Sequence, residues 1–98
     1  AGNSPGTHPV FPAAYPDVLA VTAEGGDGEA AAYANTGAFV DVMMPGRSFI
    51  EYNGTTFMIN GTSASAAYVS GLAASLSANT GQSVREVERE LRQRLPRP

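Results

Sequence analysis

Small apolar residues dominate the stretch from Ser63 to Ala78 and surround most of a helical circumference. The residues concerned are Ala64, Ala66, Ala67, Val69, Leu72, Ala73, Ala74 and Leu76. A helix that is apolar on all sides has to be covered by other elements. Gly71 would cost about 1 kcal/mol relative to alanine in an exposed helix, so its presence also indicates close packing. Asn79 to Gly81 predicts the end of this helix.

A second helix is predicted directly afterwards. Ser83 and Glu86 have the spacing of a capping box, in which each side chain binds the other residue's backbone N–H. One apolar stripe follows at helical spacing and consists of Val84, Val87, Leu91 and Leu95. Pro96 then predicts the end of the helix.

The first half of the chain is typical of loops and short strands. Ala1 to Pro16 is rich in Pro and Gly and predicts a loop. Val18 to Ala23 is a short apolar run, which favours a strand buried on both faces. Ala32 to Asn35 predicts a brief strand, and Phe39 to Met43 a longer one that ends before Pro45.

Two further strands are predicted as a hairpin. Ser48 to Tyr52 and Thr55 to Ile59 flank Asn53-Gly54, the residue pair that favours a two-residue hairpin turn. Short strands followed by two helices indicate an α/β layered architecture. These strands are too few to cover a helix that is apolar all round, so we expect part of the sheet to be missing.

Composition narrows the class of protein. The chain has 98 residues, of which 43% are hydrophobic and 8% aromatic, so one small domain with a modest core is expected. It contains no cysteine, which excludes disulfides and thiolate metal sites within these residues. No apolar run is long enough to span a bilayer, and we expect no membrane association. Ala1 opens no charged-then-apolar leader, so any signal peptide is expected outside this chain.

The net charge of −3 is unevenly distributed. One arginine accompanies six acidic residues up to Thr80, whereas five arginines accompany three glutamates from Gly81 onward. Arg85, Glu88, Arg89 and Arg92 are spaced three or four residues apart, as on a solvated helix face. We therefore expect no nucleic-acid binding.

Ser63 is the best candidate for a nucleophile. It follows a Gly61-bearing turn and opens the long apolar helix. The first N–H groups of a helix lack intrahelical partners and carry partial positive charge, so an anion that forms beside Ser63 would be stabilised. Gly61 lets the backbone approach closely before the helix begins.

Four segments of the chain resemble subtilisin-like serine proteases. Asn60 to Gly71 reads Asn-Gly-Thr-Ser-Ala-Ser-Ala-Ala-Tyr-Val-Ser-Gly, close to the family's Asn-Gly-Thr-Ser-Met-Ala-Ser-Pro-His-Val-Ala-Gly. Ala1 to Asn3 resembles the oxyanion-asparagine motif, Phe11 to Pro16 the Tyr-Pro-Ala-X-Tyr-Pro loop, and Val40 to Gly46 the Leu-Asp-Val-Met-Ala-Pro-Gly segment. The matches occur in the family's order.

The resemblance implies a partial parallel-sheet domain of the subtilisin type. Residues 1–98 would form the C-terminal part of the catalytic domain, with a buried helix after the nucleophile and a C-terminal amphipathic helix. The family's catalytic Asp and His motifs precede the oxyanion asparagine and are absent here. The expected partner is therefore the N-terminal half of the same domain, and the isolated chain is expected to be inactive. His8 follows Asn3 in a Pro/Gly-rich loop, so we interpret it as a surface residue rather than the base.

The resemblance assigns roles residue by residue. Asn3 would donate to the oxyanion together with the backbone N–H of Ser63, although Asn3 in its own context is also typical of a turn. Ala1, Gly2, Val10 and Asn60 would contact the peptide or protein substrate, with Val10 near the floor of the pocket for the residue before the scissile bond. Val10 would narrow that pocket, or else belong to the core.

No cofactor is expected to be required, although a structural Ca²⁺ or Na⁺ fits the resemblance. Some relatives bind a weak cation through positions that correspond to the carbonyls of Ala13, Tyr15 and Val18 and the Asp41 carboxylate. Hard oxygen ligands suit such ions. Asp41 is equally interpreted as a hydrogen-bond acceptor that supports the fold. The Phe11-Pro12 bond corresponds to one that is often cis in relatives.

Two functions remain open at this point. The first is a subtilisin-type serine endopeptidase that acts through an acyl-enzyme, extracellular or at the cell envelope by resemblance. The second is a subtilase-like scaffold that has lost catalysis and serves in binding or structure. The chain departs from the family pattern at Ala64, Ala67 and Tyr68, which replace Met, Pro and His, but none of these is a triad member. Retention of both Ser63 and Asn3 favours the enzyme.

Overall fold

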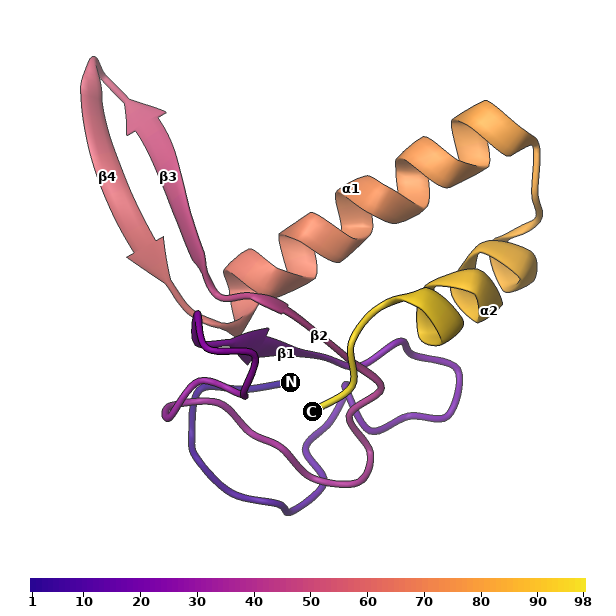
Figure 1. The fold of residues 1–98 in the computed structure, drawn as a ribbon, viewed down its shortest axis with the longest axis horizontal. Coiled ribbons are helices and arrows are strands. Elements are labelled where there is room, and N and C mark those ends of the chain that lie inside the picture. Colours follow the sequence, from indigo (N-terminus) through magenta and orange to yellow (C-terminus); the bar gives the residue numbers. More distant parts are fainter.

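The computed structural model describes all residues from 1 to 98 and shows an α/β fold with two small sheets and two helices. The elements follow in the order β1, β2, β3, β4, α1 and α2. Figure 1 shows the long helix α1 with α2 folded back beneath it, while the β3–β4 hairpin projects away from the rest of the chain. The N-terminal loop and the chain's two ends lie beside the β1–β2 pair.

The first sheet is a parallel pair of strands, β1 (Val21–Glu24) and β2 (Val42–Pro45), in which Val21 lies opposite Val42. Both strands begin three residues later than the apolar pattern predicts. The Asp41 side chain explains the shift, because its Oδ2 accepts the N–H of Ala20 at 2.8 Å and takes the donor that a backbone ladder would use. Regular pairing starts at the next residue.

The brief strand predicted for Ala32 to Asn35 is wrong. These residues form a turn, and only Asn35 makes a single bridge, to Gly6. The Asn35 side chain accepts the N–H of Gly37 at 3.1 Å, which is typical of turns closed by asparagine. The segment therefore serves to anchor the N-terminal loop rather than to extend the sheet.

The predicted hairpin is confirmed and is one residue longer at each end. β3 (Arg47–Tyr52) pairs antiparallel with β4 (Thr55–Asn60). Asn53 and Gly54 both have positive φ, 51° and 77°, as a two-residue turn of this kind requires. All the large apolar side chains of the hairpin are exposed, namely Phe49, Ile50, Tyr52, Phe57, Met58 and Ile59.

Helix α1 (Thr62–Thr80) confirms the long apolar run as a helix, and Gly81 ends it in the left-handed conformation. Only one side of α1 is fully covered, and its buried residues are Thr62, Ala64, Ser65 and Val69. Leu72 and Tyr68 remain exposed. The chain therefore leaves open a surface that its sequence predicts to be buried.

Helix α2 (Val84–Arg94) begins with the predicted capping box and ends before Pro96. Val87 and Leu91 of its apolar stripe are buried, and Leu95 packs beside them. Val84 is 82% exposed, so the stripe starts one turn later than predicted. The Phe11-Pro12 bond is cis, as expected.

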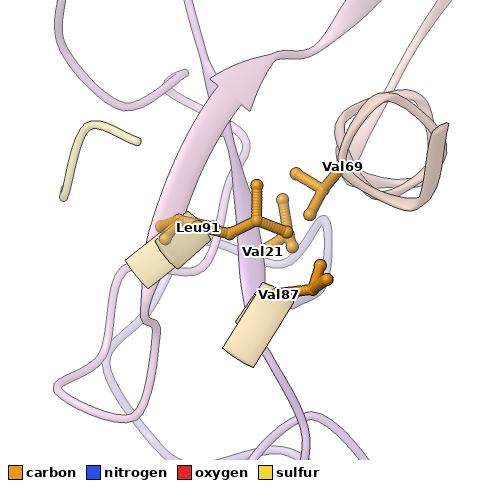
Figure 2. Close-up of a cluster of buried hydrophobic side chains, with 5 residues drawn as sticks. Val21, Val69, Val87 and Leu91 are labelled. Atoms are coloured by element: carbon orange, nitrogen blue, oxygen red, sulfur yellow. The ribbon is translucent and has the colours of Figure 1, made fainter. Parts of the chain in front are cut away.

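The main core lies where both helices meet the parallel strands. It consists of Val21, Val42, Val69, Val87 and Leu91. Figure 2 shows Val69 of α1 directed toward Val21 of β1, with Val87 and Leu91 of α2 closing the cluster. This cluster fixes the start of α1 against the end of the sheet, where the candidate nucleophile lies. Neither α1 nor α2 combines the length and the hydropathy that a membrane-spanning helix requires.

The capping box makes the stability of α2 depend on pH. The Ser83 hydroxyl and backbone N–H donate to Glu86 at 2.8 and 3.2 Å, and these bonds lower the pKa of Glu86 below its ordinary value of 4.5. Because the folded pKa is depressed, the stabilisation is complete above the ordinary value and is lost as the pH falls through the folded one. We expect the unfolding midpoint of the complete protein, followed by circular dichroism, to fall with acidification.

Ser83→Ala removes the hydroxyl, is expected to destabilise the fold by about 1 kcal/mol at neutral pH, and should flatten this acid dependence. Glu51→Gln, on the exposed hairpin, is the control variant. It removes a carboxylate that takes no part in the capping box, so the acid dependence should remain. An acid profile that Ser83→Ala leaves unchanged would contradict the prediction.

Candidate active site

Gly61 joins β4 to α1 and turns the chain toward Ser63. Its φ of 152° lies in a region that favours glycine, and its N–H donates to the carbonyl of Gly46 at 2.9 Å. A Cβ at this position would lie 3.2 Å from Nδ2 of Asn3. The glycine thus allows Asn3 to lie directly against the backbone that carries the nucleophile.

Gly46, at the end of β2, supports the same turn from the other side. A Cβ there would lie 2.6 Å from Cβ of Ala23 and even closer to the Tyr33 hydroxyl, so no larger residue fits. The Tyr33 hydroxyl donates to the Gly46 carbonyl at 3.3 Å. The Gly46–Gly61 contact therefore fixes where α1 starts relative to the sheet.

The Asn3 side chain caps α1 from a distance of 59 residues along the chain. Its Oδ1 accepts both the backbone N–H and the hydroxyl of Thr62, each at 2.9 Å. The Thr62 hydroxyl in turn accepts the N–H of Gly2 at 3.2 Å. Because a backbone N–H can only donate, the amide oxygen must face Thr62, and Nδ2 is left beside Gly61 with its hydrogens available.

The electrostatic setting at the start of α1 favours a negative charge. Gly61 provides no side-chain cap, and the first turn contains no acidic residue that would neutralise the helix terminus. Ser63 is exposed and lies in this first turn. Its hydroxyl, its own N–H and the Asn3 amide are therefore grouped at a partially positive terminus.

An open hollow of about 610 Å³ lies beside these groups. It brings together five of the candidate catalytic and substrate-binding residues, Ala1, Gly2, Asn3, Val10 and Ser63. Ala13 and Val18 also line it, deeper in the N-terminal loop. Val10 is 38% exposed, so it faces this hollow rather than belonging wholly to the core.

Buried Asn35 holds the loop that carries Asn3. Its N–H donates to the carbonyl of Gly2 at 3.0 Å, and its Nδ2 donates to the carbonyl of His8 at 3.3 Å. The Thr22 hydroxyl binds the Asn35 carbonyl at 2.7 Å. His8 is exposed and does not line the hollow, in agreement with its interpretation as a surface residue.

Asn60 lies apart from the other candidates. Its Oδ1 accepts from Nε of Arg47 at 3.3 Å, and both residues line a separate hollow of about 300 Å³ with Glu24 and Tyr33. Its lining contains Arg47 of β3 and Asn60 of β4 but neither Ser63 nor Val10. Any contact of Asn60 with substrate would therefore occur on a different side from Val10.

Asp41 is engaged by protein groups at both carboxylate oxygens. Oδ2 accepts from Ala20 at 2.8 Å, and Oδ1 forms an ion pair with Arg92 of α2. The carbonyl of Tyr15 already accepts the N–H of Val18 at 3.0 Å. This arrangement is the one expected of a residue that supports the fold.

Sequence reasoning missed three residues of the site. Thr62 and Asn35 are described above, and Ser65, which is fully buried, donates its hydroxyl to the carbonyls of Met44 and Pro45 at 2.9 and 3.1 Å. Ser65 occupies a position where the family motif has alanine, and this departure was the available signal. The hydroxyl fastens the first turn of α1 to the end of β2.

Of the departures after the serine, Ala64 is buried and Tyr68 is exposed. The Tyr68 hydroxyl donates to the carbonyl of Arg47 at 3.3 Å and so links α1 to β3. Without the proline of the family motif, α1 runs as one continuous helix to Thr80.

The chain is similar in sequence and structure to known proteins. The chain resembles the solved structure of the prenylagaramide maturation protease PagA with a TM-score of 0.79 and 31% sequence identity. The match covers 92% of this chain but 36% of that one, so the chain spans about a third of the length of that relative. No match was found among curated protein sequences. The sequence profile of the subtilase family, Peptidase_S8, matches residues 1–95, and the chain therefore belongs to the subtilase family of proteases.

Proposed function

We propose that this chain supplies the nucleophile and one oxyanion donor of a subtilisin-type serine endopeptidase. The observation that carries the proposal is the double hydrogen bond from Thr62 to Oδ1 of Asn3, which fixes the Asn3 amide beside the first turn of α1. In this proposal residues 1–98 form the C-terminal part of the catalytic domain.

The chemistry follows from the geometry. Ser63 Oγ would attack the carbonyl carbon of the scissile bond. Negative charge would then develop on the carbonyl oxygen of the substrate, between Nδ2 of Asn3 and the N–H of Ser63. The positive end of α1 adds to this stabilisation. The acyl-enzyme forms when the leaving amine takes the proton that a general base has removed from Ser63, and water then releases the acyl group.

The base and its orienting aspartate would come from polypeptide outside these residues. A serine hydroxyl without a base is a poor nucleophile, and His8 lies outside the hollow that contains Ser63. The proposed partner is the N-terminal half of the same domain.

Two features support a partner of this kind. The parallel sheet contains only two strands, too few for independent stability, and the Ala1 nitrogen donates to the carbonyl of Val21 along the edge of β1. In addition, Tyr68 and Leu72 leave one side of α1 uncovered. A preceding strand and further helices would cover both surfaces.

The role of Ser63 as nucleophile can be tested directly. In the complete protein, a serine-reactive phosphonate is expected to label Ser63, and Ser63→Ala should abolish labelling and peptide hydrolysis. Ser70→Ala, on an exposed part of the same helix, is the control and should retain both. The purified 98-residue chain is expected to show no turnover because it lacks the base. Absence of labelling in the complete, folded protein would support the inactive scaffold instead.

One substitution separates the donor role of Asn3 from its structural bond to Thr62. Asn3→Asp keeps an oxygen that can accept from Thr62 but removes the amide hydrogens. We expect kcat to fall about 10² to 10³-fold, equivalent to about 2.7–4 kcal/mol, with little change in KM or in the unfolding midpoint. Asn79→Ala, at the far end of α1, is the control. Full activity of Asn3→Asp would exclude the oxyanion role.

The hollow beside Ser63 predicts a substrate preference. Because Val10 faces this space, the complete enzyme is expected to prefer small side chains before the scissile bond. Val10→Gly should shift kcat/KM toward large aromatic side chains by about tenfold or more relative to alanine. A peptide panel measures both preferences, and a preference of the unmodified enzyme for aromatic residues would be the contrary result.

A further inference from the structure

Asp41 and Arg92 form an ion pair that joins the start of β2 to the last turn of α2. The pair is partly buried, with side-chain exposures of 18% for Asp41 and 33% for Arg92. The other Asp41 oxygen accepts the N–H of Ala20. Both oxygens of the carboxylate thus have protein partners, one of them a full positive charge.

The guanidinium is held from a second side. Its Nη2 donates to Oε1 of Glu88 at 3.0 Å, one helical turn earlier. Arg92 and Glu88 line a charged hollow with Pro16 and Asp17. The guanidinium therefore stands beside the segment from Ala13 to Val18, whose carbonyls are the other expected cation ligands.

These residues do not fit a bound Ca²⁺ or Na⁺. Ca²⁺ takes six to eight oxygen ligands at about 2.3–2.6 Å, with carboxylates as the strongest. The only carboxylate of the candidate set already neutralises Arg92, and a second cation next to that guanidinium would meet like charge at short range.

We propose that Arg92 is a built-in counter-charge for Asp41, so that the docking of α2 on the sheet requires no bound metal ion. The guanidinium is covalently part of the chain. Unlike a metal ion bound from solution, it is therefore present at every ion concentration. This inference stands on the ion pair and does not depend on the proposed protease activity.

The consequence is a C-terminal segment fastened to β2 at two adjacent points. The carbonyl of Pro96 accepts the N–H of Met43 at 2.7 Å, two residues beyond Asp41. Val42, which lies between Asp41 and Met43, belongs to the same core cluster as Leu91, the residue before Arg92. The ion pair and the backbone bond together hold α2 in the orientation that buries Leu91.

The test measures thermal unfolding of the complete protein in the presence of chelator and after addition of millimolar Ca²⁺ or Na⁺ at constant ionic strength. We expect the wild-type midpoint to be the same in all three conditions. Arg92→Gln should lower it by about 2–8 °C, and added Ca²⁺ should recover part of this loss because the Asp41 oxygen is then free. Arg94→Gln removes the same charge from an arginine side chain that is 74% exposed, and it is expected to behave as the wild type.

A double variant tests the pairing itself. If Asp41 and Arg92 act together, Asp41→Asn combined with Arg92→Gln should lower the midpoint by less than the sum of the single variants. Additive losses would overturn the proposal.

A direct binding measurement needs no destabilised variant. Tb³⁺ serves as the probe, and its luminescence is excited through nearby tyrosines. Absence of saturable signal in the wild type supports the proposal. A saturable signal that Asp41→Asn abolishes, or a wild-type midpoint that rises with Ca²⁺ or Na⁺, would overturn it.

Discussion

The bond pair between Thr62 and Asn3 is the constraint on which the site depends. The backbone N–H and the hydroxyl of Thr62 both donate to Oδ1 of Asn3, and these two bonds fix the direction of the Asn3 amide nitrogen. The same threonine hydroxyl accepts from Gly2, so the loop and the helix terminus are tied at two positions. Thr62 therefore holds the N-terminal loop through Gly2, and Asn3 caps α1, which has no side-chain cap from its own N-cap residue. Loss of either partner would release the nucleophile turn and the amide together.

The elements that the sequence predicted well are those whose signals are local. The capping box of α2, the glycine that ends α1 and the Asn-Gly turn of the hairpin each act within a few residues, and each is found in the structure. The boundaries of β1 and β2 were missed because a long-range polar contact sets them. The Asp41 carboxylate binds the N–H of Ala20 from 21 residues away, and an apolar pattern contains no trace of that bond.

In the candidate site, too, the residues with local sequence signals were predicted and those set by long-range contacts were not. Ser63 and Asn3 could be found because they belong to motifs, and the structure brings both to one hollow with Ala1, Gly2 and Val10. Asn35 was interpreted as part of a strand, since nothing in its neighbours shows that its amide reaches the His8 carbonyl 27 residues earlier. Asn60 is the first residue of the motif yet lines another hollow, because it ends β4 and lies before the Gly61 turn that carries the chain to Ser63.

A core of five buried side chains is small for a chain that carries two helices and two sheets. Apolar contacts are not directional, so this cluster by itself would tolerate rotation of α1 and α2 against the strands. Hydrogen bonds and ion pairs at the edges of the cluster fix the orientation of both helices against the strands. Ser65 fastens α1 to the end of β2, and Arg92 with Pro96 fastens α2 to its beginning. The position of Ser63 is therefore determined by polar contacts around a small apolar centre, which explains why the residues that position it escape a search for hydrophobic periodicity.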